Sequence, residues 1–203
     1  MRKLVLTAAT AALALGVAAP AFAHDSDKAP FTGVRVEALG GYDNLSSGDD
    51  GATGKDGFVY GGALGYDAQV GGVVLGVEGE ITGSTTKVRA TDVLTAGDRL
   101  RVGAGRDLYV GGRLGYAVSD RALIYAKAGY TNARVNIDYA VGTARIEDHA
   151  NLDGYRVGAG IEYNVTPRAY VKAEYRYSHY GQADDYDIDA NRNQVLAGVG
   201  YRF

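Results

Sequence analysis

An alternation of apolar and polar side chains with a period of two constrains the fold of this chain more than any other feature. Near the C-terminus, Val195, Val199 and Tyr201 occupy odd positions, whereas Gly198 and Arg202 occupy even positions. Because successive side chains of a β-strand point to opposite faces, this pattern predicts a strand with one apolar face and one small or charged face. The same pattern occurs eight times, at about residues 31–42, 57–67, 73–82, 107–118, 122–134, 152–164, 169–180 and 193–203.

The connections between these eight segments alternate in length. Short connections at 67–72, 119–121 and 164–168 alternate with long polar connections at about 43–56, 83–106, 135–151 and 181–190. An even number of strands, joined by short turns at one end and long loops at the other, is typical of outer-membrane barrels. An open sheet edge in hydrocarbon leaves backbone groups unpaired, so the last strand must pair with the first. The sequence therefore predicts an all-β protein, an eight-stranded antiparallel up-and-down transmembrane β-barrel.

The N-terminal segment has the pattern of a secretory signal peptide. Two basic residues precede an apolar run over 4–17, which is followed by small residues. This order predicts cleavage between Ala23 and His24. We therefore expect residues 1–23 to be a signal peptide and residues 24–203 to be the barrel domain. A retained membrane anchor is the alternative, which the small-residue end and the short apolar run disfavour.

Aromatic side chains are sorted along the apolar face. If the N-terminus lies in the periplasm, one group falls near the short turns and a second near the long loops, with aliphatic residues between them. Amphipathic rings are enriched at both interfaces of a membrane. The alternative is a soluble β-sandwich, in which tyrosine is not expected to concentrate in two belts. The expected belts contain Tyr66, Tyr116, Tyr163, Tyr201 and Phe203 near the short turns, and Tyr42, Tyr60, Tyr130, Tyr155 and Tyr177 near the long loops.

Charged residues concentrate on the opposite face, which would line the interior of the barrel. An eight-stranded barrel is just wide enough for side chains to fill, and buried charges must be paired. We therefore expect a plugged, ion-paired interior, with a narrow porin-like path for ions or small solutes as the alternative. The expected interior charges are Arg35, Glu37, Glu78, Glu80, Arg113, Lys127, Arg156, Glu162, Lys172, Glu174, Arg176 and Arg202.

The short turns bring neighbouring strands together and so predict some of the ion-pair partners. Two cations that meet across the turn at 119–121 need anions, and the third strand is their expected source. The expected partners are Glu78 and Glu80 for Arg113 and Lys127, and Lys172 for Glu162.

No catalytic or metal site is expected. Ser178 and His179 are a candidate nucleophile and base, but adjacent residues of a strand point to opposite faces. The three histidines are scattered at positions 24, 149 and 179, and cysteine is absent. We therefore expect no enzyme activity and no cofactor, and a membrane-embedded hydrolase is the least favoured alternative.

Two of the long connections carry concentrated charge. Asp185, Asp187 and Asp189 match the start of a calcium-binding loop, but Ala190 stands where glycine is required. We expect a solvated acidic loop, with weak divalent-cation contact to lipopolysaccharide phosphates as the alternative. The 83–106 connection is expected to be an ordinary polar loop, or alternatively to face anionic lipid headgroups. Its basic residues are Lys87, Arg89, Arg99, Arg101 and Arg106.

The net charge of −3 makes the whole chain a poor candidate for binding nucleic-acid phosphate. Four segments resemble a known family instead. They are YAKAGY at 125–130, GAGIEY at 158–163, AEYRY at 173–177 and GVGYRF at 198–203. They resemble the small outer-membrane barrel proteins of proteobacteria, the porin-family or opacity-type surface antigens related in shape to the OmpA transmembrane barrel.

This resemblance implies an integral protein of the cell outer membrane, with periplasmic termini and extracellular loops. It implies a structural or surface-facing role in the envelope and contact with outer-membrane lipid and lipopolysaccharide. It also implies that the barrel-assembly machinery reads the last strand, here through Val199, Tyr201 and Phe203. We expect a monomer more than an oligomer.

Overall fold

The computed structural model describes residues 29–47, 55–85, 87–91, 99–141, 144–181 and 190–203. None of these residues forms a helix long and apolar enough to cross a membrane. The strands are β1 (Gly33–Ser47), β2 (Lys55–Val70), β3 (Val73–Ser84), β4 (Lys87–Thr91), β5 (Arg99–Ala117), β6 (Ala122–Val141), β7 (Ala144–Asn164), β8 (Ala169–Gly181) and β9 (Ala190–Arg202).

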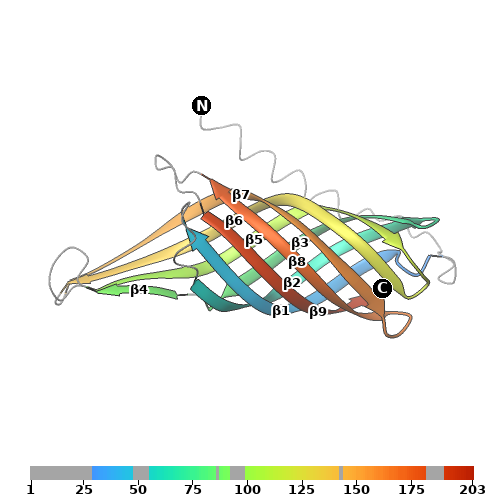
Figure 1. Cartoon of the computed structure of the whole chain (residues 1–203), viewed down its shortest axis with the longest axis horizontal. Coiled ribbons are helices and arrows are strands. Elements are labelled where there is room, and N and C mark those ends of the chain that lie inside the picture. Colours follow the sequence, from blue (N-terminus) through green and yellow to red (C-terminus); the bar gives the residue numbers. More distant parts are fainter. Residues whose placement is uncertain (1–28, 48–54, 86, 92–98, 142–143, 182–189) are drawn as a thin grey trace, which may run out of the picture.

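The strands form one antiparallel sheet that closes on itself (Figure 1). β1 pairs with β2 on one side and with β9 on the other, and β3 pairs with β5. β4 follows β3 in the chain and pairs with the same neighbour, β5, beyond the end of β3. The described residues therefore form the predicted closed eight-stranded barrel, in which β3 and β4 occupy one strand position.

The two ends of the barrel differ in the connections that they carry. At the short-turn end, β2 connects to β3 through 71–72, β5 to β6 through 118–121, and β7 to β8 through 165–168. Gly71 has a φ of 60°, the left-handed conformation that this two-residue turn requires and that glycine adopts without steric cost. The opposite end, which carries the other connections, is the long-loop end.

Several strands extend further toward the long-loop end than the sequence predicts. Residues 135–151 were expected to form a loop, but β6 and β7 remain paired as far as Val141 and Ala144. The 83–106 connection is likewise largely strand, because β4 pairs with the first residues of β5. Polar composition favoured a loop, yet the period of two continues through residues 135–141, and this periodicity agrees with the observed backbone.

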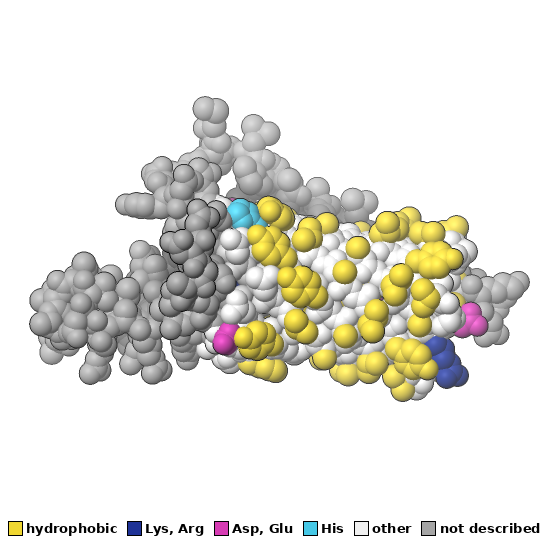
Figure 2. Space-filling view, in the orientation of Figure 1, with side chains coloured by type: hydrophobic (Ala, Val, Ile, Leu, Met, Phe, Trp, Pro, Cys, Tyr) yellow, Lys and Arg dark blue, Asp and Glu magenta, His cyan; other side chains and the backbone are white. Residues whose placement is uncertain are grey.

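The two faces of the wall differ as the alternation predicts. On β1, Val34 and Val36 are exposed, whereas the residues that follow each of them, Arg35 and Glu37, are buried. Figure 2 shows apolar side chains spread over the visible wall, with charged side chains only toward its two ends. Aliphatic and aromatic side chains therefore cover the outside, and the charged residues fill the inside.

A short segment before β1 closes the barrel interior at the short-turn end. The expected first strand began at about residue 31, but β1 begins at Gly33 and the preceding residues turn inward. The Phe31 side chain is fully buried and packs with Val74 and Leu123. Its backbone N–H donates to Gln69 Oε1 at 3.1 Å. The segment thus forms an apolar floor beneath the charged interior.

Candidate functional site

The barrel interior holds sixteen buried charged side chains among the described residues, eight basic and eight acidic. The twelve residues expected from the sequence all lie buried there, together with Asp43, Asp67, Asp107 and Arg192, which the sequence pattern did not identify. Equal numbers of each sign leave this interior network electrically neutral, and an uncompensated buried charge would be expensive. The network consists of Arg35, Glu37, Asp43, Asp67, Glu78, Glu80, Asp107, Arg113, Lys127, Arg156, Glu162, Lys172, Glu174, Arg176, Arg192 and Arg202.

Asp67 organises the network at the short-turn end. Its Oδ2 lies 3.1 Å from Arg35 Nε, 2.7 Å from Arg113 Nη2 and 3.1 Å from Arg202 Nη2. Glu162 supplies the second carboxylate, with Oε2 2.9 Å from Arg113 Nη2 and Oε1 2.8 Å from Arg202 Nη2. Three guanidinium groups from three strands therefore converge on one aspartate.

This arrangement corrects two of the expected ion pairs. Arg113 pairs with Asp67 and Glu162 rather than with Glu78 or Glu80. Glu162 is in register with Lys172 across β7 and β8, but its ion pairs are made with Arg113 and Arg202. The physical reason is that Asp67 lies inside β2, where its side chain faces inward, instead of in a turn.

Lys127 occupies the centre of the network. Its Nζ lies 2.8 Å from Glu78 Oε1, 2.5 Å from Glu80 Oε1 and 2.9 Å from Glu174 Oε1. The expected pairing of Lys127 with the two glutamates of β3 is therefore confirmed. Three carboxylates surround a single ammonium group, so this layer needs further cations.

The remaining cations of the central layer come from neighbouring strands. Lys172 Nζ lies 2.5 Å from Glu37 Oε2 and 3.3 Å from Glu174 Oε2. Arg35 bridges the central layer to the short-turn end, because it pairs with Glu37 and Glu78 as well as with Asp67. The two layers are thus one continuous network.

A third layer lies toward the long-loop end and depends on Asp107 and Asp43. Asp107 Oδ2 lies 2.5 Å from Arg156 Nη2 and 2.9 Å from Arg192 Nη1, and it accepts a hydrogen bond from Tyr180 Oη at 2.9 Å. Arg192 also donates from Nε and Nη2 to the two oxygens of Asp43, each at 2.7 Å. This two-point geometry is the strong form of an arginine–carboxylate pair.

Arg176 links the third layer to the central one. Its Nη1 lies 2.5 Å from Glu80 Oε2, and its Nε donates to Gln194 Oε1 at 2.7 Å. Gln194 in turn donates to Asp43 Oδ1 at 3.0 Å. A continuous chain of hydrogen bonds and ion pairs therefore runs along most of the interior.

Besides Tyr180, three buried tyrosines fill space among these charges, and of the three only Tyr125 was expected on the inward face. Tyr125 and Tyr170 donate to network carboxylates, and Tyr109 lies with Lys127 Nζ 4.8 Å from its ring centroid. Each tyrosine lies over an inward-facing glycine of the same or a neighbouring strand. A Cβ added at the glycine would stand 2.2 to 2.7 Å from the tyrosine side chain, in the pairs Tyr109 with Gly111, Tyr125 with Gly160 and Tyr170 with Gly200.

The side chains of the network are packed against one another in the described cross-section of the barrel. In every ion pair of the network, the exposed fraction of each side chain is 6% or less. Side chains that line a water-filled pore would be exposed to that water. The arrangement can therefore hold the wall together from inside, and it favours the plugged interior over the narrow polar path.

The candidate nucleophile and base are not brought together. Ser178 is buried and its Oγ accepts a hydrogen bond from Arg156 Nε at 2.7 Å. His179 points to the other face, where its Nδ1 lies 3.0 Å from Asn191 Oδ1. Ser178 therefore orients an interior arginine, and the pair lacks the contact that hydroxyl activation requires.

The outer wall carries the aromatic residues that the sequence analysis assigned to belts. All ten reach the surface, with Tyr66 and Tyr177 only partly exposed. Phe58 and Tyr175 are also exposed and were not among the expected members. The last strand presents Val199, Tyr201 and Phe203 on this surface, and the Tyr201 and Phe203 rings meet edge to face with centroids 5.0 Å apart.

Some expected features lie outside the described residues. These include the cleavage site between Ala23 and His24 and the acidic series Asp185, Asp187 and Asp189. Of the basic residues expected in the 83–106 connection, Arg106 is the one whose side chain is described, and it is exposed.

Comparisons with solved structures agree with the fold. The barrel superposes on Neisserial surface protein A with a TM-score of 0.60 and 18% identity, covering 85% of this chain and 98% of that one. It superposes on Ail, the attachment invasion locus protein of Yersinia pestis, with a TM-score of 0.53 and 16% identity, covering 85% and 99%. At these identities the likeness concerns the fold alone.

Comparisons of sequence identify relatives and a family. The chain is 32% identical over 130 residues to the 22 kDa outer membrane protein of Rhizobium leguminosarum bv. viciae, covering 56% of each. It is 28% identical over 102 residues to the 31 kDa outer-membrane immunogenic protein of Brucella melitensis biotype 1, covering 45% of this chain and 42% of that one. The chain thus matches about half the length of these relatives. The family model for the outer membrane protein beta-barrel domain matches residues 9–203, so the chain belongs to this family and is an integral outer-membrane protein.

Proposed function

We propose that this protein is a closed, non-conducting barrel whose role in the envelope is structural and surface-facing. The observation that carries the proposal is the neutral interior network, in which eight basic and eight acidic side chains are buried against one another. An ion that entered would have to displace these pairs and lose its own hydration, and both steps are costly in a low-dielectric interior. The Phe31 floor adds an apolar barrier at the short-turn end.

Conductance of the purified barrel in planar bilayers tests this proposal. We expect no steady current steps at moderate salt, because the network leaves no hydrated path. A porin with a wide channel, reconstituted in parallel, shows that insertion is detected. Reproducible steps from this protein in membranes where it is folded would overturn the closed interior and favour a narrow channel.

We also propose that the short-turn end faces the periplasm and the long-loop end faces outward. Outer-membrane barrels have short periplasmic turns and longer extracellular loops, and this barrel has the same asymmetry. The native chain has no cysteine, so a single introduced cysteine reports its side of the membrane. A membrane-impermeant maleimide on intact cells should label Gly51→Cys and not Ser119→Cys; the reverse pattern would contradict this orientation.

We propose that the barrel-assembly machinery recognises this protein, as the resemblance implies. The last strand would be read by the barrel-assembly machinery through Val199, Tyr201 and Phe203, which are exposed on one face of β9 and its end. Deleting Phe203 should lower the fraction of folded protein in outer membranes, and an unchanged fraction would contradict the proposal. We propose no enzyme activity, since Ser178 and His179 point to opposite faces, and we propose that the barrel is monomeric.

A further inference from the structure

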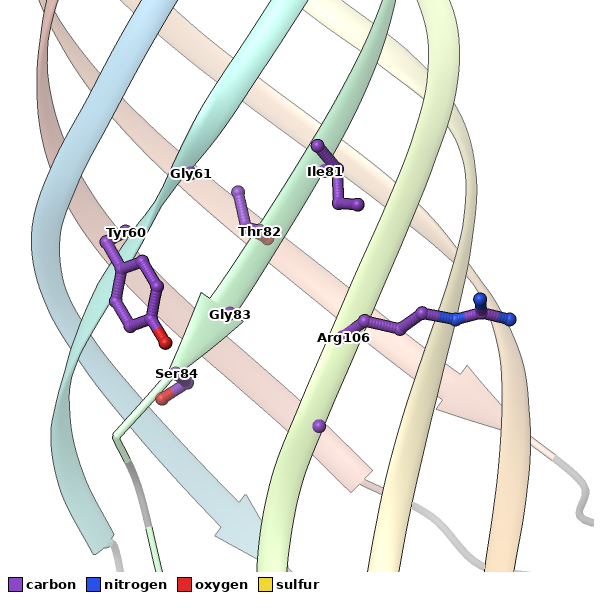
Figure 3. A pocket seen from close by; sticks show the side chains of 8 residues that line it. Tyr60, Gly61, Ile81, Thr82, Gly83, Ser84 and Arg106 are labelled. Carbon is purple, nitrogen blue, oxygen red and sulfur yellow. The ribbon is translucent and has the colours of Figure 1, made fainter.

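A groove opens on the outer wall, and its inner lining reaches the interior network through Ser84, which donates to Asp43. It has a volume of about 390 Å³ and opens across β2, β3 and β5 toward the long-loop end (Figure 3). Tyr60 is in register with Gly83, and Gly83 is in register with Arg106. A Cβ at Gly83 would stand 3.3 Å from the Tyr60 ring, so the missing side chain keeps the groove open. Exposed Tyr60 and Ile81 give it an apolar lining.

A cation stands at the edge of this groove. Arg106 is exposed, and Figure 3 shows its side chain running from β5 away from Tyr60 and Ile81. The pairing of β5 with β6 is interrupted between Ala104 and Asp107, so Gly105 and Arg106 together stand opposite Arg134. This bulge places two arginines on neighbouring strands at the same level of the outer wall.

The two arginines differ in their described partners from those of the interior network. Arg134 is partly exposed, and its Nε donates to the neutral Asn151 Oδ1 at 3.3 Å. Among the described side chains, neither Arg106 nor Arg134 forms an ion pair. By contrast, every arginine of the interior network has at least one carboxylate partner.

Two described acidic residues of the outer wall at this end accept hydrogen bonds from neutral donors. Asp153 accepts hydrogen bonds from Tyr130 Oη and from Asn132 Nδ2. Asp56 is engaged in the same way by Tyr42 Oη and Asn44 Nδ2. The wall therefore presents two guanidinium groups with no ion-pair partner among the described side chains, beside a groove that Tyr60 and Ile81 line in part.

We propose that Arg106 and Arg134 bind the phosphate of a membrane lipid whose acyl chain lies in the groove beside Tyr60 and Ile81. Guanidinium groups bind phosphate oxygens through charge-assisted hydrogen bonds, often two at a time. The exposed Tyr60 and Ile81 side chains offer a hydrocarbon chain an apolar contact that a free anion cannot use. The site goes beyond the closed-barrel function, and only the choice of leaflet rests on the proposed orientation.

Native mass spectrometry of the folded protein in a neutral detergent tests the site, with diphosphoryl lipid A as the probe. We expect bound lipid A at low molar excess and weaker binding of lipid A from which both phosphates have been removed. A cation near a membrane surface strengthens binding of anionic lipid about fivefold. Arg106→Gln and Arg134→Gln should therefore each weaken binding by about fivefold.

Arg121→Gln is the matched control, because Arg121 is an exposed arginine in a turn at the short-turn end. It should bind lipid A as the native chain does. The proposal is overturned if Arg121→Gln weakens binding as much as Arg106→Gln, or if the dephosphorylated lipid binds equally well. Displacement of lipid A by equimolar inorganic phosphate would also overturn it, since the acyl chain would then contribute nothing. Conductance of the same preparation tests the closed interior separately.

Discussion

The two faces of the barrel wall are stabilised in opposite ways, although each strand contributes to both. Along β3, Val77 and Ile81 are exposed to the outside, while Glu78 and Glu80 are buried inside. The outer face needs only to be compatible with hydrocarbon, so many apolar side chains would serve at a given position. The inner face depends on particular partners, because each buried charge requires a specific opposite charge within reach. Substitutions on the inner face should therefore be the more damaging.

Asp67→Asn should produce the largest loss of stability. It removes the carboxylate on which Arg35, Arg113 and Arg202 converge and leaves the shape of the side chain almost unchanged. Arg113 and Arg202 then share Glu162 alone. Removing one partner of a buried ion pair costs about 3–5 kcal/mol, and we expect a loss in this range in the free energy of unfolding. Denaturant titration of the barrel in lipid vesicles measures it.

Asp107→Asn sharpens this prediction by making the same chemical change in the third layer. There, Arg192 keeps its two-point contact with Asp43, and Arg156 keeps Glu80 at 3.5 Å. The two arginines thus retain different carboxylates, although Arg156 shares Glu80 with Lys127 and Arg176. We expect a smaller loss than for Asp67→Asn, and an equal or larger loss would show that the convergence on Asp67 is not the critical feature.

The sequence predicts the two faces well because alternation is a local property. A strand pairs with its neighbour along its whole length, so the face of one residue determines the face of the next. This is why all twelve expected interior charges are buried. The prediction fails where polar composition near a strand end resembles a loop. Asp43 and Arg192 lie one residue beyond the predicted strands, and Asp67 was assigned to a turn.

The choice of partners inside the barrel could not be predicted from the sequence. Adjacent strands suggested Glu162 with Lys172, but the short radius of the barrel lets side chains reach strands that are distant in the chain. Arg192 and Asp43, which bond twice, are separated by 149 positions. The outer arginines Arg106 and Arg134 depend on a bulge, which leaves no periodic signal. Their grouping required the observed register.

Val77→Arg tests the outer face with the next largest effect. Val77 lies midway along β3 and is exposed to the outside. An arginine at the bilayer midplane of a barrel costs about 2–4 kcal/mol, which falls to about 0–1 near the interface. The vesicle titration should give a loss in the first range for Val77→Arg and in the second for Tyr116→Arg. Equal losses at the two positions would contradict the assignment of Tyr116 to a belt.

Gly111→Ala and Gly112→Ala compare the two faces at neighbouring residues with one added methyl group. At Gly111 the new Cβ would stand 2.2 Å from Tyr109 Oη and 2.5 Å from the Ala128 carbonyl oxygen, whereas at Gly112 its nearest neighbour is 3.7 Å away. Overpacking of this kind costs about 1–3 kcal/mol, and surface changes usually stay within about 0.5 kcal/mol. We therefore expect Gly111→Ala to lower the free energy of unfolding and Gly112→Ala to leave it nearly unchanged.

A second substitution identifies the cause of the Gly111→Ala effect. Tyr109 Oη is buried without a hydrogen-bond partner in the described structure, so Tyr109→Phe removes the closest clashing atom and breaks no hydrogen bond. In a double-mutant cycle, Gly111→Ala should cost less in the Tyr109→Phe background than in the native one. The Ala128 carbonyl remains close, so the recovery should be partial. Strictly additive losses would mean that the backbone contact, and not the tyrosine, requires glycine at this position.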